Sequence, residues 1–170
     1  MSLPARVERW RSLAARVVGE MLPMHRYSPG VPLVLAVIAA ESGGDPAAAA
    51  RTRAGDYARG LMQVRETTAR GLGLKETAQL HDPYVGLRYG VHYLARQLDR
   101  YGGKVAPAVA AYNAGTASYT EAETFTNQDY VDRVARWLKR AAPAGLAAAG
   151  MALGTLAVAL LLNKRRRRSR

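Results

Sequence analysis

Residues 31–46 read VPLVLAVIAAESGGDP, and this stretch decides the fold. Pro32 suits the first turn of a helix, because the N–H that proline lacks would have no partner there. Residues 33–40 are all apolar, which predicts a helix that is buried on every side. Glu41 ends the apolar run, and the glycines at 43–44 are suited to stop the helix in a left-handed cap.

The position of Glu41 has a chemical consequence. Apolar surroundings and the negative end of the helix dipole both disfavour a charged carboxylate, so both should raise its pKa. A carboxylic acid that is still protonated near neutral pH can act as a general acid. From this stretch alone the alternative stays open that Glu41 is solvated or paired with an arginine at the helix end.

Composition limits the class of protein. The chain has 170 residues, enough for one domain and an appendage, and it contains no cysteine, which excludes a disulfide scaffold and thiolate zinc sites. Its net charge is +12, of which six charges lie in residues 164–170, so the rest carries +6 and suits an anionic partner. His25, His81 and His92 show no metal-binding spacing, and we expect no metal and no cofactor.

Apolar periodicity predicts further helices and no convincing strand. Asp82 followed by proline is a strong helix start, and the apolar residues after it recur at helical spacing. The helices are expected at 7–22, 31–41, 67–72, 83–101, 105–113 and 130–140. The fold class is therefore predicted to be all-α.

The C-terminal part differs from the rest. Residues 141–162 carry no charge, and as a helix they would be roughly 33 Å long, enough to span a bilayer. We therefore expect a transmembrane helix over 141–163, with Gly150 and Gly154 offering a small-residue face for pairing with another helix. The basic residues 164–170 would stay on the cytoplasmic side, which suits membrane topology better than nucleic-acid binding.

Four stretches stand in a fixed order: AVIAAESGGDP, RGLMQ, LHDPYVGLRYGVHYLARQL and AAYNAG. Together they resemble the soluble lytic transglycosylase family, over residues 30–140. The resemblance implies a lysozyme-like fold and an enzyme that cleaves peptidoglycan between N-acetylmuramic acid and N-acetylglucosamine without water, leaving a 1,6-anhydro end. Peptidoglycan glycan strands would then be the partner.

The resemblance also implies the site residues. Glu41 matches the catalytic acid/base of the family's ES motif. The substrate-binding positions that match are Ser42, Gly60, Leu61, Met62, Gln63, Tyr112, Asn113 and Tyr130. The sequence departs from the family at 126–128, where Thr-Asn-Gln stands in place of the usual Glu-Thr-Arg, so Tyr130 is less firmly matched than Glu41.

The apolar spacing, the resemblance and the uncharged C-terminal run together predict how the chain is organised. Residues 1–25 would form an amphipathic helix packed on a catalytic domain at 26–140, followed by the membrane helix at 141–163 and the basic tail at 164–170. Charged residues interrupt the N-terminal MSLPARVERWRS, so no signal peptide is expected.

A single-pass protein without a signal peptide suits a bacteriophage virion with an internal membrane, where it would open the wall locally. A host envelope enzyme or an endolysin is the alternative.

A single placed carboxylate needs a reaction that does without a second one. Ordinary glycosidases use two carboxylates. A muramic acid could replace the second, because its acetamido oxygen can stabilise the developing cation and its 6-hydroxyl can attack internally.

Two other functions stay open. One is a goose-type lysozyme-like hydrolase, in which Asp45 or Asp56 would activate water, and the other is a non-catalytic glycan-binding or structural component.

Overall fold

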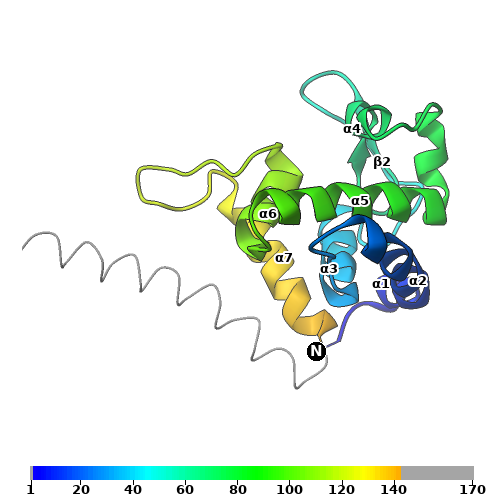
Figure 1. Cartoon of the computed structure of the whole chain (residues 1–170), viewed down its shortest axis with the longest axis horizontal. Coiled ribbons are helices and arrows are strands. Elements are labelled where there is room, and N and C mark those ends of the chain that lie inside the picture. The colour runs from blue at the N-terminus through cyan, green and yellow to red at the C-terminus, as the bar shows by residue number, and fades with distance from the viewer. Residues whose placement is uncertain (1, 143–170) are drawn as a thin grey trace, which may run out of the picture.

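The computed structural model describes residues 2–142. Helices dominate, and one small sheet interrupts them (Figure 1). In chain order the elements are α1 (Ala5–Glu8), α2 (Arg11–Met21), η1 (Leu22–Met24), α3 (Val31–Glu41), β1 (Ala49–Arg51), β2 (Tyr57–Arg59), β3 (Val64–Arg65), α4 (Glu66–Gly71), η2 (Thr77–His81), α5 (Pro83–Arg100), α6 (Val105–Ala114) and α7 (Gln128–Ala141).

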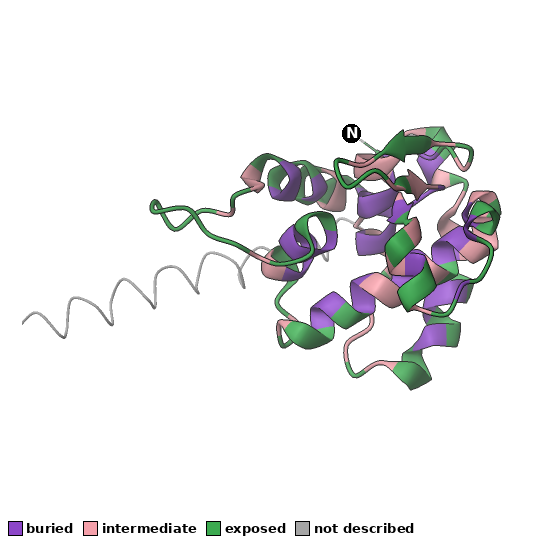
Figure 2. Cartoon of the chain, turned by 90° about the horizontal axis from the view of Figure 1, so that it is seen from above, coloured by how far each residue is buried: buried purple, intermediate pink, exposed green. Residues whose placement is uncertain are grey.

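Helix α3 is the centre of the core. Residues 33–38 are all buried, and Pro32 lies in the first turn, as the sequence predicts. The helix packs most extensively against α7 and also contacts α1 and α2. The turned view shows these central helices largely in the colour of buried residues (Figure 2). An apolar helix enclosed in this way fixes the position of its last residue, Glu41, and of Ser42, which follows it.

Helix α5 runs between two groups of elements. In Figure 1 the sheet and α4 lie on one side of it, and α3 and α2 lie on the other. Asp82 caps its start by accepting a hydrogen bond from the Val85 N–H at 2.9 Å. The predicted apolar stripe, which includes Leu87, Val91 and Leu94, is fully buried. Helix α5 therefore forms a rigid platform that holds both groups.

The N-terminal segment is two short helices rather than the single helix expected at 7–22. Helix α1 ends at Glu8, and α2 begins at Arg11. Between them the Trp10 Nε1–H donates to the Gly44 carbonyl at 3.0 Å. This bond ties the N-terminal segment to the backbone that follows α3.

The predicted absence of strands was wrong. Strands β1, β2 and β3 form an antiparallel sheet in that order, with Ala49 opposite Arg59 and Ala58 opposite Arg65. The strands are two or three residues long and mostly exposed. Such short strands cannot show the period-two alternation that indicates a strand in a sequence.

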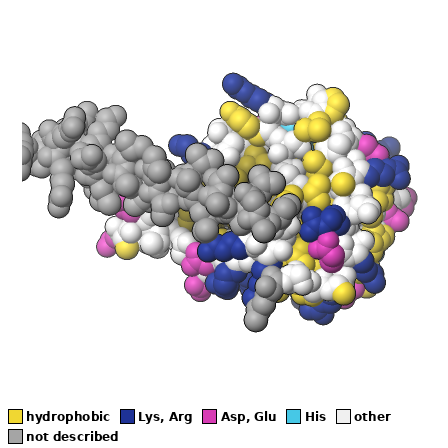
Figure 3. Space-filling view, turned by 90° about the horizontal axis from the view of Figure 1, so that it is seen from below, with side chains coloured by type: hydrophobic (Ala, Val, Ile, Leu, Met, Phe, Trp, Pro, Cys, Tyr) yellow, Lys and Arg dark blue, Asp and Glu magenta, His cyan; other side chains and the backbone are white. Residues whose placement is uncertain are grey.

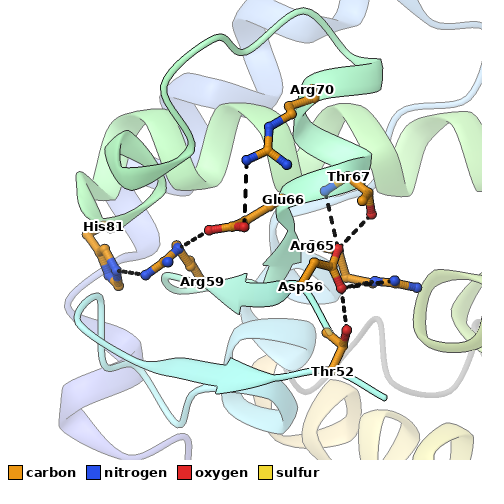
Figure 4. Close-up of polar contacts among 8 residues, drawn as sticks. All are labelled: Thr52, Asp56, Arg59, Arg65, Glu66, Thr67, Arg70 and His81. Carbon is orange, nitrogen blue, oxygen red and sulfur yellow. Dashed lines mark hydrogen bonds and ion pairs between the residues drawn. The ribbon is translucent and has the colours of Figure 1, made fainter. Parts of the chain in front are cut away.

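The carboxylate of Asp56 holds the hairpin formed by β1 and β2 in place (Figure 4). Asp56 accepts hydrogen bonds from the Thr52 hydroxyl, from Arg65 Nη2 at 3.0 Å and from the Thr67 hydroxyl at 2.8 Å. Nearby, Glu66 on α4 accepts from Arg59 Nε on β2 at 2.7 Å. The hairpin is therefore fixed to β3 and α4 by polar bonds rather than by an apolar core.

The glycine at position 60 meets a tight contact. Its φ is +75°, and a Cβ there would lie 2.0 Å from the Leu80 carbonyl oxygen. Glycine tolerates this φ and leaves room for the Leu80 carbonyl, whereas a residue with a Cβ would clash there. Across the same region a Cβ on Gly90 of α5 would lie 2.5 Å from the Met62 sulfur. Two glycines thus let the segment 60–63 lie directly against its neighbours.

The expected transmembrane helix over 141–163 is corrected. Ala141 is the last residue of α7, where it is buried in the core, and Ala142 is extended ahead of a proline. The remaining residues of that span lie outside the described residues. Of the helices within 2–142, none is long and apolar enough to cross a membrane.

Two predictions, an all-α fold with a transmembrane helix and a membrane-anchored location, are therefore wrong. The described chain is a mainly helical domain with a small sheet, and a single-pass membrane anchor is not supported. The pairing face expected at Gly150 and Gly154 and the basic tail at 164–170 lie outside the described residues.

Candidate functional site

Two distant helices bring Glu41 and Tyr130 together. Glu41 is the last residue of α3, and Tyr130 lies in the first turn of α7. The Tyr130 hydroxyl donates a hydrogen bond of 2.6 Å to Glu41 Oε1. Tyr130 is buried, and the extensive packing of α3 on α7 fixes the distance between the two side chains.

The carboxyl of Glu41 has an unusual pKa. Some of the side chain still reaches solvent, but protein atoms surround the carboxyl, and this burial raises its pKa from 4.5 to about 7. The hydrogen bond from Tyr130 and the positive charge of Arg133 act in the opposite direction and lower it. Near neutral pH a substantial fraction of Glu41 is therefore protonated and able to give up a proton.

The hydroxyl of Ser42 forms hydrogen bonds with backbone groups of the protein and does not point into solvent. Its hydroxyl donates to the Leu61 carbonyl at 2.8 Å and accepts from the Gly44 N–H at 3.1 Å. The residue after Glu41 thus fastens the end of α3 to the segment 60–63.

Within that segment the side chains divide into two kinds. Leu61 and Met62 are fully buried and belong to the core. Gln63 is partly buried, has a φ of +46°, and donates from Nε2 to the carbonyls of Ala48 and Gly60 at 3.0 Å each. Within residues 2–142 no donor binds the side-chain oxygen of Gln63, which can therefore accept from a ligand. The carbonyls of Ala48 and Gly60, at the two ends of the β1–β2 hairpin, therefore fix the orientation of the Gln63 amide group through its nitrogen.

Tyr112 lies in the core next to this segment. Its hydroxyl donates to the Met62 carbonyl at 2.8 Å, and its ring packs on that of Tyr93 with centroids 5.1 Å apart. Burial first, and then the charge of Glu41, raise the pKa of Tyr112 well above its usual range. Glu41, Tyr112 and Tyr130 therefore lie near one another, with both hydroxyls kept neutral.

Asn113, the next residue, is exposed and has a defined orientation. Its Oδ1 accepts a hydrogen bond of 3.0 Å from Asn127 Nδ2, which also donates to the Ala110 carbonyl at 3.0 Å. The amide nitrogen of Asn113 is thereby turned away from Asn127. In the sequence Asn127 is visible only as a departure from the family pattern, because a contact across 14 residues leaves no periodic signal.

The other carboxylates considered for catalysis are engaged elsewhere. Asp45 is exposed and accepts from the Ala47 N–H at 2.9 Å, in a local turn. Asp56 accepts from four groups around it, and these bonds, led by that of Thr52, hold its pKa far below its usual range. Among residues 2–142, no cluster of three or more His, Cys, Asp or Glu side chains is placed to hold a metal ion.

Comparisons with known proteins agree with this geometry. The Transglycosylase SLT domain family matches residues 23–130. A transglycosylase from Enterobacteria phage PRD1 is 38% identical over 91 residues, which are 54% of this chain and 31% of that protein.

Solved structures show the same fold. An inactive glutamate-to-glutamine mutant of the lytic transglycosylase Slt from Pseudomonas aeruginosa is similar with a TM-score of 0.59 and 25% identity, over 77% of this chain and 23% of that one. The 70 kDa soluble lytic transglycosylase from Escherichia coli is similar in fold, with a TM-score of 0.52 and 20% identity, over 81% and 21% of the two chains.

The chain therefore spans less than a third of the length of each of these relatives. The family match, by contrast, covers more than half of the chain and includes the segments that hold Glu41, Gln63, Asn113 and Tyr130. On this ground the chain belongs to the Transglycosylase SLT domain family.

Proposed function

We propose that the chain is a peptidoglycan lytic transglycosylase and that Glu41 is its catalytic acid and base. The observation that carries the proposal is the carboxyl of Glu41, which has a pKa of about 7 and accepts a short hydrogen bond from a buried tyrosine. Membership of the SLT family and the similar lytic transglycosylases supply the substrate class.

The proposed reaction uses Glu41 twice. Protonated Glu41 gives its proton to the oxygen that links muramic acid C1 to the next sugar, and the C1–O bond breaks. The muramic acid 6-hydroxyl then attacks C1, and the carboxylate takes the proton that this hydroxyl loses. No water enters, and the enzyme ends in its starting protonation state. The hydrogen bond from Tyr130 stabilises the carboxylate in the intermediate state.

The neighbouring side chains would take separate roles. Asn113 and Gln63 each keep one end of an oriented amide for the sugar or its acetamido group. Ser42 and Tyr112 act as positioning residues, because both bond to backbone carbonyls of the segment 60–63. Leu61 and Met62 would act through packing, and Gly60 through its close contact with the Leu80 carbonyl.

The hydrolase alternative is less well supported. It needs a second carboxylate that accepts a proton from water. Asp56 is held ionised by hydrogen bonds to Thr52, Arg65 and Thr67, so its basicity is low and its oxygens are occupied. Asp45 lies exposed in a local turn. An internal nucleophile removes the need for either residue.

Digestion of purified peptidoglycan by the Glu41→Gln variant tests the assignment. Release of soluble muropeptides should fall at least about a hundredfold, the typical effect of removing a general acid. Glu76→Gln makes the same change at an exposed glutamate of the described chain and should keep wild-type activity. A folded Glu41→Gln variant with wild-type activity would disprove the role of Glu41.

We also propose a biological setting, local opening of the cell wall by a bacteriophage. The 38% identical transglycosylase of phage PRD1 supports this setting. Detection of the protein in purified virions that degrade peptidoglycan in a gel assay would agree with it. A protein found only in uninfected bacterial cells would favour a host wall-remodelling enzyme.

A further inference from the structure

One imidazole joins the two ends of the β1–β2 hairpin. The Nδ1–H of His81, the last residue of η2, donates to the Pro46 carbonyl at 3.0 Å. On the other side of the ring, Arg59 Nη1 donates to His81 Nε2 at 3.3 Å (Figure 4). Pro46 precedes β1, and Arg59 is the last residue of β2. His81 therefore bridges the chain where it enters the hairpin and where it leaves it.

The two partners fix the protonation state of the ring. A backbone carbonyl can only accept a hydrogen bond, and a guanidinium can only donate one. The ring nitrogen that faces Pro46 must therefore carry a proton, and the nitrogen that faces Arg59 must carry none. His81 makes both contacts only as a neutral imidazole with its proton on Nδ1.

The groups on either side of this bridge are held in place as well. Arg59 Nε donates to Glu66 Oε1 at 2.7 Å, which leaves Nη1 for His81. The Leu80 carbonyl is packed between two glycines, because a Cβ would lie 2.0 Å from its oxygen at Gly60 and 2.5 Å from it at Gly86. The backbone next to His81 is therefore fixed against both the hairpin and α5.

The ends that this bridge joins also carry the two carbonyls that orient Gln63. Ala48 directly precedes β1 and Gly60 directly follows β2, and the Gly60 N–H donates to the Ala48 carbonyl at 2.9 Å. Gln63 Nε2 donates to both carbonyls at 3.0 Å. The φ of Gln63 is +46°, a left-handed conformation that a residue other than glycine keeps only when its surroundings impose it. The direction of the Gln63 amide therefore depends on how the hairpin ends are held.

We infer that His81 is a positioning residue for the side-chain amide of Gln63. By joining the two ends of the hairpin, it keeps the carbonyls of Ala48 and Gly60 at the spacing that the two hydrogens on Gln63 Nε2 require. The side-chain oxygen then has a constant direction, in which it can accept from the N–H of an N-acetylated sugar. This last step rests on the proposed function, whereas the effect of His81 on the amide does not.

His81→Phe tests the effect on the amide directly, because it keeps a ring and removes both hydrogen bonds. Exchange of the Gln63 side-chain N–H protons with solvent, followed by NMR, should become about tenfold faster, the worth of roughly one hydrogen bond. His81→Asn keeps a donor for the Pro46 carbonyl and should restore part of the protection. His92→Phe, the same change at a half-buried histidine of α5 that packs on His25, should leave the exchange rate unchanged.

A double-variant experiment on peptidoglycan tests whether His81 acts on activity through Gln63. His81→Phe and Gln63→Ala should each lower kcat/KM about tenfold, which corresponds to about 1.4 kcal/mol. The double variant should then stay within about twofold of Gln63→Ala, because the two residues act as a unit, whereas independent losses would multiply to about a hundredfold.

The two measurements separate this inference from the proposed function. Amide exchange that is unchanged in both His81 variants, or losses of kcat/KM that multiply, would overturn the inference. Faster amide exchange in His81→Phe, together with a wild type that cleaves no peptidoglycan, would overturn the proposed function and leave His81 as the residue that positions Gln63.

Discussion

Two opposing influences set the acidity of Glu41. Burial raises the pKa to about 7, while Tyr130 and Arg133 lower it. The upward direction was predictable, because an apolar helix that ends in one carboxylate places that carboxylate at the edge of a core. Tyr130 was matched only through the family resemblance, because a contact between residues 89 positions apart leaves no pattern in the sequence.

Replacing Tyr130 tests this balance. Tyr130→Phe removes the donor to Glu41 Oε1, which destabilises the charged form and raises the pKa of Glu41 further. Activity that requires protonated Glu41 should then persist to higher pH, with the alkaline limb of the kcat/KM profile shifted up by roughly one pH unit. A limb that stays in place or moves to lower pH would show that Tyr130 does not act through Glu41.

Asn127 offers a second test at this scale. Its Nδ2 orients Asn113, so Asn127→Ala should lower kcat/KM for peptidoglycan by roughly three- to tenfold, the usual worth of one hydrogen bond. Asn127→Asp keeps the shape but cannot donate, and it should lower kcat/KM as much. If the aspartate variant keeps wild-type kcat/KM, the residue serves packing and not orientation.

Among the helices and strands, the long elements could be predicted from the sequence and the short ones could not. Helices α3 and α5 were predicted well because each repeats its apolar pattern over several turns or is apolar throughout. The sheet was missed because its strands are two or three residues long, and long-range polar contacts of Asp56 hold it in place. The close contact of Gly60 with the Leu80 carbonyl could not be read from the sequence, because it joins residues that are far apart in the chain.

Two glycine substitutions test how the hairpin is held. Gly60→Ala combines a φ of +75° with a Cβ placed 2.0 Å from the Leu80 carbonyl oxygen. Gly55→Ala has a φ of +90° and no atom within 4 Å of the added Cβ. In urea unfolding Gly55→Ala should cost about 1 kcal/mol, and Gly60→Ala should cost about 3 kcal/mol or more, because overpacking adds to backbone strain. Equal costs would contradict the close contact.

For the whole molecule, the site depends on elements that are far apart in the chain. Helix α3 supplies Glu41, the segment 60–63 supplies Gln63, and helices α6 and α7 supply Asn113 and Tyr130. Basic side chains spread over the face in Figure 3, with acidic ones among them, in keeping with an anionic polymer as substrate. All of these parts lie before residue 143.

A truncation tests whether residues 2–142 suffice. A chain that ends at residue 142 keeps α7 and the buried Ala141, whose carbonyl accepts a hydrogen bond from Arg11 at 3.2 Å. Its unfolding free energy should stay within about 0.5 kcal/mol of the full chain, and its kcat/KM should be unchanged. A chain that ends at residue 127 lacks all of α7 and should fail to fold. Lost activity at 142 would assign a role to the residues beyond it.

The central claim is that Glu41 supports cleavage by an internal nucleophile. Digestion of peptidoglycan in water enriched with heavy oxygen, followed by mass spectrometry of the muropeptides, tests it most directly. We expect new ends that are lighter by one water, in the 1,6-anhydro form, without heavy oxygen. New reducing ends that carry heavy oxygen would contradict the claim and identify the enzyme as a hydrolase.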